Sequence, residues 1–174
     1  LARAYRKREK VLKFEGGYHG SSDYGTISVT PQNPREFPQA TPGSPGVPQA
    51  IEELVLVAPF NDIETTSAII QRHHDELAAV ILEPFQRILP PAPGFLQGLR
   101  DVTHRYGIPL IFDEVVTGFR LAYGGAQEYY SVVPDLAAYG KIVGGGFPLG
   151  AIAGREELMR YFNPDMEESG EYVP

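Results

Sequence analysis

The sequence predicts an α/β fold, a mostly parallel β-sheet with helices on both faces. Short apolar runs bounded by turn residues recur along the chain, and helical patterns lie between several of them. Strands that alternate with helices in this way form parallel sheets, and the connecting helices cover the two faces of the sheet.

Five apolar runs read as buried strands, because each is short and ends at turn residues. They are Lys10–Glu15, Glu53–Pro59, Leu77–Pro84, Ile108–Glu114 and Asp135–Gly140. The carboxyl ends of parallel strands lie at one edge of a sheet, which is where open α/β sheets bind their ligands.

Helices are predicted by their start and stop signals as well as by periodicity. Asn61 or Asp62 can cap "IETTSAIIQRHHDE", and Pro93-Gly94 can open a helix that stops at Gly107. The opening "LARAYRKREK" and the later "REELMRYF" are also helical patterns. The pair His73-His74 falls near a helix C-terminus, where the helix dipole and solvent explain it better than a metal does.

The Pro-rich segment Gly20–Ala50 interrupts this regular alternation. A connection of this length without secondary structure is either functional or disordered. A mobile surface loop is one interpretation. We favour the other, a lid over a site beside the sheet.

Composition excludes several classes of function. The chain of 174 residues has a net charge of -7, which argues against a nucleic-acid or membrane-surface partner. It has no Cys, so neither a disulfide nor a thiolate site is possible. No apolar stretch approaches the roughly 20 residues of a membrane span, and no signal-peptide h-region opens the chain. We expect a soluble, cytoplasmic protein.

Neither end of the chain coincides with a capped helix or a linker. The chain begins inside a helical pattern without a capping residue, and it ends in the acidic, loop-like "NPDMEESGEYVP". We therefore expect an internal piece of a longer chain.

Four predicted strands end in residues whose side chains can take part in catalysis or bind a cofactor. They end in Tyr18-His19, in Glu83, in Asp113-Glu114 and in Lys141. Two carboxylates after a buried strand need a cation nearby. A lysine that leaves an apolar strand into three glycines should be partly desolvated, so that its neutral amine is available, whereas solvent should keep Lys7, Lys10 and Lys13 charged.

These parts suit pyridoxal phosphate as a cofactor. A lysine can form a Schiff base with it, an aspartate can pair with its protonated ring nitrogen, and an aromatic ring can stack on it. A carboxylate pair after a strand also occurs in magnesium-binding ATPases, but their G-x-x-x-x-G-K-[ST] loop is absent. No metal site is predicted.

The chain resembles the class III, pyridoxal-phosphate-dependent aminotransferases of fold type I, nearest to the glutamate-1-semialdehyde 2,1-aminomutase branch. The matching segments include "KFEGGYHG", "SPGVP", "AAVILEP", "IPLIFDEVVTGFR" and "YGKIVGGGFPLGA". The resemblance implies that Lys141 forms the Schiff base and moves the substrate proton. It implies that Asp113 keeps the pyridine nitrogen protonated, so that the pyridinium is the cation that this carboxylate meets.

The same resemblance implies roles for further residues. Tyr18 would stack on one face of the cofactor ring and Val115 would lie against the other. Glu83 would line the site, and His19 would support it from behind. Glu114 is expected to bond to the protein scaffold.

The resemblance also implies an organisation for residues 1–174, which would be the central part of the large, cofactor-binding domain, a three-layer sandwich. The small domain would be absent, and the whole enzyme would be a homodimer acting on a small-molecule amino donor and acceptor. Transamination is the expected activity. An intramolecular amino shift, as in the aminomutases, and a catalytically incomplete fragment stay open. The segments "EPFQRILPP" and "TPQNPREFPQATPGSPGVP" differ from the aminomutase branch, which counts against the amino shift.

Overall fold

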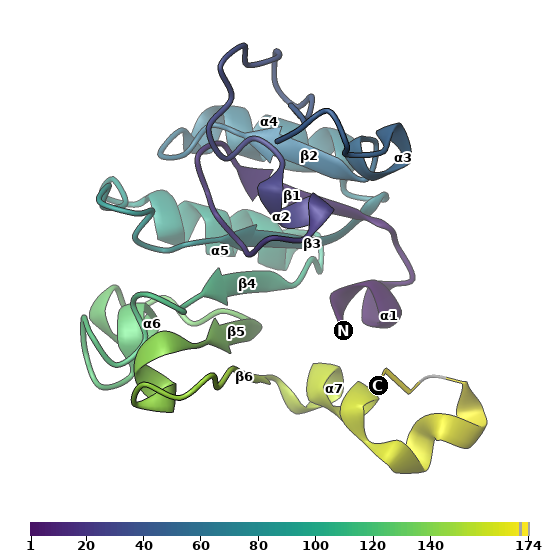
Figure 1. Ribbon diagram of the computed structural model, residues 1–174, viewed down its shortest axis with the longest axis vertical. Coiled ribbons are helices and arrows are strands. Elements are labelled where there is room, and N and C mark those ends of the chain that lie inside the picture. Colours follow the sequence, from purple (N-terminus) through teal and green to yellow (C-terminus); the bar gives the residue numbers. More distant parts are fainter. Residues whose placement is uncertain (171, 174) are drawn as a thin grey trace.

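A computed structural model describes residues 1–170 and 172–173 of the chain. These residues form a six-stranded sheet in the order β2-β1-β3-β4-β5-β6 (Figure 1). The strands are β1 (Lys10–Phe14), β2 (Val55–Ala58), β3 (Leu77–Leu82), β4 (Leu110–Asp113), β5 (Leu136–Tyr139) and β6 (Ala151–Gly154). Every neighbouring pair is parallel except β5 and β6, which are antiparallel. The α/β fold class and the mostly parallel sheet are confirmed.

All five predicted strands are present, and only β6 escaped prediction. Its four residues are Ala and Gly around one Ile, and all four are exposed. Neither an apolar run nor an alternating pattern marks such a strand. Pairing with β5, in which Gly154 lies opposite Leu136, creates β6.

Two long helices cover one face of the sheet, α4 (Ile63–His73) and α5 (Phe95–Arg105). Asp62 caps α4, because its Oδ1 accepts the backbone N–H of Thr65 at 2.9 Å. Gly94 starts α5 with a φ of 81°. Side chains of both helices join alternate residues of the strands in one buried core, which includes Leu12, Phe14, Val80, Leu82, Leu110, Phe112, Ile70, Phe95 and Leu99.

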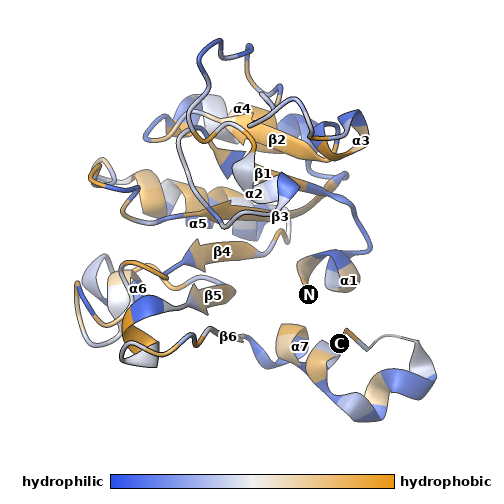
Figure 2. Ribbon diagram, in the orientation of Figure 1, coloured by the Kyte–Doolittle hydropathy of each residue, from blue (hydrophilic) through white to orange (hydrophobic). Residues whose placement is uncertain are grey.

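The opposite face of the sheet is partly covered by the Gly20–Ala50 segment. This segment was expected to lack secondary structure, but the structure shows that it has some. It contains α2 (Asp23–Thr26) and leads into α3 (Gln49–Glu52). Ile27, Ala40 and Val47 of the segment are buried in a second core against β2. In Figure 2 the strand β2 is orange, while the exposed turns of the segment include blue, hydrophilic stretches. The segment is therefore packed at its two ends and exposed at its tip.

The remaining helices are short. They are α1 (Ala2–Arg6), α6 (Gly125–Tyr129), α7 (Glu156–Met159) and the 3-10 turns η1 (Lys141–Gly144), η2 (Arg160–Phe162) and η3 (Pro164–Ser169). The predicted helices at both ends of the chain correspond to α1 and to α7 with η2. Among the described residues, no helix combines the length and the apolar character that crossing a bilayer requires.

Candidate active site

The candidate site lies where four consecutive strands of the sheet end. The strands β1, β3, β4 and β5 are parallel neighbours, so their carboxyl ends meet at one edge. The predicted site residues lie at that edge or in the turns that follow it.

Asp113, the last residue of β4, contacts two hydrogen-bond donors. Its Oδ2 lies 2.8 Å from Nδ1 of His19, and its Oδ1 accepts the backbone N–H of Val115 at 3.1 Å. The side chains are mostly buried, with exposed fractions of 13% for Asp113 and 8% for His19. Because a carboxylate accepts, Nδ1 of His19 carries the proton that they share. Among the described residues, the side-chain partner of Asp113 is the imidazole of His19.

Glu114 contacts no cation among the described residues and serves the scaffold, as expected. Its carboxylate accepts the backbone N–H groups of Ala126 and Gln127, at 2.8 and 3.0 Å, and the hydroxyl of Thr117 at 2.6 Å. A Cβ on Gly125 would lie only 2.5 Å from this carboxylate, and the φ of Gly125 is 76°. Glu114 therefore fixes the start of α6, and only glycine fits between them.

Tyr18 and Glu83 are connected across the turn that follows β1. The backbone N–H of Tyr18 donates to Oε2 of Glu83 at 2.9 Å. Glu83 is buried, whereas the side chain of Tyr18 is 46% exposed. Glu83 thus holds the backbone of Tyr18 in place and leaves the aromatic ring free to contact a ligand.

Val115 packs against the strand end that leads to Lys141. A Cβ on Gly140 would lie 3.2 Å from Cγ1 of Val115, so the glycine permits a close approach. Lys141 follows directly and begins η1 in the left-handed region, with a φ of 49°. Val115 and Lys141 therefore belong to one corner of the site, between β4 and β5.

The expected environments of the lysines are wrong in two respects. Lys141 is exposed in this chain rather than partly desolvated. Lys13, expected in solvent, is only 2% exposed, and its ammonium donates to the backbone carbonyls of Gly25 and Ile27. Burial lowers the pKa of Lys13 to about 8, although the carboxylate of Glu83 opposes the shift.

Two buried polar atoms behind the site lack a hydrogen-bond partner within the described chain. They are Nε2 of His19 and Oε1 of Gln86. A Cβ on Gly17 would meet them at 3.2 and 3.4 Å, so both atoms border the same glycine. Gln86 was not predicted as a site residue. Its only sequence signal is its position three residues after Glu83, in the segment that departs from the aminomutase branch.

Comparison with known proteins identifies the family. The family model "Aminotransferase class-III" matches residues 1–171. The chain belongs to the class III aminotransferases. A glutamate-1-semialdehyde 2,1-aminomutase from Methanococcus maripaludis is 47% identical over 168 residues, which make up 95% of this chain and 39% of that protein.

Solved class III aminotransferase structures show the same fold. An ω-transaminase from Sphaerobacter thermophilus superimposes with a TM-score of 0.89 at 50% identity, covering 94% of this chain and 39% of that chain. A transaminase with pyridoxal phosphate bound gives a TM-score of 0.84 at 33% identity, covering 94% and 38%. The chain therefore spans about 39% of the length of relatives that it matches.

The site residues of this chain suit pyridoxal phosphate, which the second of these solved transaminases holds. Asp113 offers a mostly buried carboxylate to a ring nitrogen, Tyr18 offers an exposed aromatic face, and Lys141 offers an exposed amine. No group of three or more His, Cys, Asp or Glu side chains suited to a metal ion occurs in residues 1–170 and 172–173. His73, which ends α4, instead bonds through Nδ1 to Oε1 of Glu76 at 3.0 Å.

Proposed function

We propose that this chain is the central part of the large domain of a pyridoxal-phosphate-dependent transaminase. The enzyme would transfer an amino group from an amino acid or amine to an oxo acceptor. One observation carries the proposal: the carboxylate of Asp113 is held by His19 at the end of β4, beside the strand that leads to Lys141. The share of the relatives that the chain covers supports a longer enzyme around it.

Bound pyridoxal phosphate supplies an electron-withdrawing ring that stabilises negative charge at the substrate carbon. The chain contributes the charge that maintains this property. The carboxylate of Asp113 keeps a proton on the ring nitrogen, because ionised Asp113 favours a cation beside it. The N–H groups of Val115 and His19 hold that carboxylate in position.

The remaining residues orient the ring and move the proton. Tyr18 would cover one face of the ring and Val115 would lie against the other, while Glu83 fixes the backbone of Tyr18. The Nζ atom of Lys141 would hold the cofactor and, once displaced by the substrate's amine, would carry the proton to and from the substrate carbon. Each predicted site residue thus has its own role in holding or using the cofactor. His19 acts on the cofactor only through Asp113.

A second candidate function is an intramolecular amino shift. It is favoured by the names of three similar relatives, which are glutamate-1-semialdehyde 2,1-aminomutases at 46–49% identity. The two functions differ in stoichiometry. A transaminase needs a separate oxo acceptor and leaves a deaminated donor, whereas an aminomutase converts one substrate into an isomer of equal mass. Mass spectrometry of products formed with and without an added oxo acid distinguishes them.

The proposal includes a homodimer in the cytoplasm. Large apolar side chains such as Ile88, 92% exposed, and Phe147, 80% exposed, leave surface that a second copy or the rest of the full-length chain would cover. Analytical ultracentrifugation of the full-length enzyme tests this assembly, because a monomeric enzyme with full activity would contradict it.

The decisive experiment is reduction of the full-length, cofactor-loaded enzyme with borohydride, followed by peptide mass spectrometry. The pyridoxyl adduct should lie on the peptide that contains Lys141, and Lys141→Ala should lack both the adduct and the visible absorbance. Lys13 is the informative competitor, because burial lowers its pKa to about 8, although its ammonium is bonded to the carbonyls of Gly25 and Ile27. An adduct on Lys13 and none on Lys141 would overturn the proposal.

A further inference from the structure

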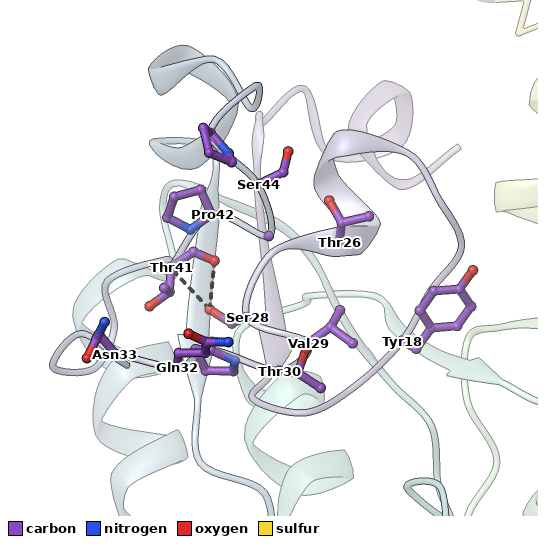
Figure 3. A pocket seen from close by; sticks show the side chains of 13 residues that line it. Tyr18, Thr26, Ser28, Val29, Thr30, Gln32, Asn33, Thr41, Pro42 and Ser44 are labelled. Carbon is purple, nitrogen blue, oxygen red and sulfur yellow. Dashed lines mark hydrogen bonds between the residues drawn. The ribbon is translucent and has the colours of Figure 1, made fainter.

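A cavity of about 730 Å³ lies beside Tyr18, between its ring and the Gly20–Ala50 segment (Figure 3). Small-molecule sites commonly have volumes of about 300–1,000 Å³, so this cavity can hold a substrate side chain as large as an aromatic ring. Tyr18 is the residue proposed to stack on the cofactor. The cavity therefore shares Tyr18 with the proposed cofactor site.

The side chains that line the cavity are uncharged. Hydroxyl and amide groups alternate with proline and valine, and none of the thirteen lining residues is Asp, Glu, Lys, Arg or His. Among the polar groups are those of Thr26, Ser28, Thr30, Gln32, Asn33 and Thr41. Groups of this kind can donate to and accept from a neutral ligand, but they cannot neutralise an ionised one.

The cations closest in sequence to this wall are committed to other partners. The ammonium of Lys13 donates to the carbonyls of Gly25 and Ile27, which belong to the same run as Thr26 and Ser28. Arg35 donates to the carbonyl of Ala40 and to the carboxylate of Glu52. Neither cation lines the cavity. A carboxylate entering it would lose water without gaining a counter-charge from this chain.

Hydrogen bonds hold the wall in one shape. The backbone N–H of Ser28 donates to the carbonyl of Thr41 at 2.8 Å, and the backbone N–H of Thr41 donates to Oγ of Ser28 at 2.9 Å. The carbonyl of Ser28 in turn accepts the N–H of Gly16 at 2.8 Å. The part of the wall around Ser28 and Thr41 is therefore held in place by hydrogen bonds.

We propose that this cavity binds the side chain of the amino donor and that this side chain is uncharged. The inference rests on the proposed transaminase function, since Tyr18 marks the cofactor position. It narrows that function to donors with alkyl, aromatic or neutral polar side chains.

The test is the first half-reaction of the full-length enzyme, without an oxo acceptor. The loss of visible absorbance is timed after mixing with phenylalanine or glutamate, each as the α- and the β-amino acid. Of the α- and the β-amino acids, one series will react faster with the enzyme. In that series phenylalanine should react at least about 10-fold faster than glutamate at subsaturating concentration. Faster reaction of the glutamate donor in both series, or no reaction of either phenyl donor, would overturn the inference.

A charge placed in the wall provides an independent arm. Gln32→Arg replaces an amide with a guanidinium of similar reach, and it should raise the rate with the anionic donor about 10-fold or more relative to the phenyl donor. Gln39→Arg is the matched control, because Gln39 lies on the same segment but lines a different hollow. Equal donor preference in Gln32→Arg and wild type would count against the cavity as the side-chain site.

Different results would contradict the transaminase function and the assignment of the cavity. An enzyme without visible absorbance and without an adduct on Lys141 contradicts the transaminase function itself. An enzyme that shows both, but reacts better with the anionic donors, contradicts only the assignment of this cavity.

Discussion

His19 and Asp113 are 94 positions apart in the chain, and their side chains meet at 2.8 Å behind the candidate site. They reach each other because β1 and β4 are separated in the sheet only by β3. The contact places an imidazole N–H on the carboxylate that is proposed to hold the cofactor's ring nitrogen. It predicts that the two residues act on the same property of the enzyme.

In the full-length enzyme, Asp113→Asn should lower kcat by at least about 10²-fold, because a neutral amide does not keep the ring nitrogen protonated. His19→Phe should lower kcat by about 10–100-fold, as expected for a residue that orients another. Steady-state kinetics measures both effects, and circular dichroism checks the fold. Turnover near the wild-type value in Asp113→Asn would remove Asp113 from its proposed role.

Removing a charge from Glu114 should affect stability rather than chemistry. In Glu114→Gln one carboxylate oxygen becomes an amide donor that faces N–H groups at the start of α6, which should cost about 1–3 kcal/mol. Glu128→Gln is the control, since Glu128 accepts the N–H of Gly124 at the exposed side of the same helix. Urea unfolding of both variants measures the difference. Equal losses in the two variants would show that the buried contacts of Glu114 contribute nothing special.

The strands and the long helices could be predicted from the sequence because their signals are local. Apolar runs, the Asp62 cap and the Gly94 start lie within the elements that they define. The short elements β6 and α6 depend on distant partners, Leu136 for one and Glu114 for the other. Local patterns do not contain this information.

The sequence predicted where in the fold the candidate site residues lie, but not what surrounds each of them. Strand ends and motif resemblance brought Asp113 and Lys141 to one edge of the sheet, which the strand order confirms. The contact between His19 and Asp113 requires that strand order to be known. Lys13 had a local signal, because a lysine inside a parallel strand buried on both faces cannot reach solvent. That signal was outweighed by the nearby basic helix end.

The tip of the Gly20–Ala50 segment should be a site of proteolysis. Arg35 is exposed there, whereas Ile27 and Val47 anchor the two ends of the segment. In the full-length enzyme, trypsin should cut after Arg35, and saturating cofactor should slow this cut if the segment covers the site. Cleavage after the exposed Arg8, which follows α1, provides the reference rate. Equal rates at Arg35 with and without cofactor would leave only a surface loop.

Lys13 should make the stability of the protein depend on pH. Burial lowers its pKa from the ordinary lysine value of 10.5 to about 8. Between these two values the unfolded chain binds a proton at Lys13 that the folded chain lacks. The contribution of Lys13 to the unfolding free energy therefore rises as pH increases from about 8 to about 10.5, by roughly 3 kcal/mol in total. Below pH 8 this contribution stays at its lowest value.

Lys13→Met removes the titrating group and should remove this rise. Urea unfolding of wild type and Lys13→Met at intervals from pH 7 to about 10.5 measures it as a growing difference in unfolding free energy. Leu12→Met, on the same strand but in the apolar core, is the matched control. It should shift stability by a similar amount at every pH. If the wild-type and Lys13→Met curves run parallel across this range, the ammonium of Lys13 is not held at the lowered pKa that its burial between β1 and the Gly25–Ile27 carbonyls predicts.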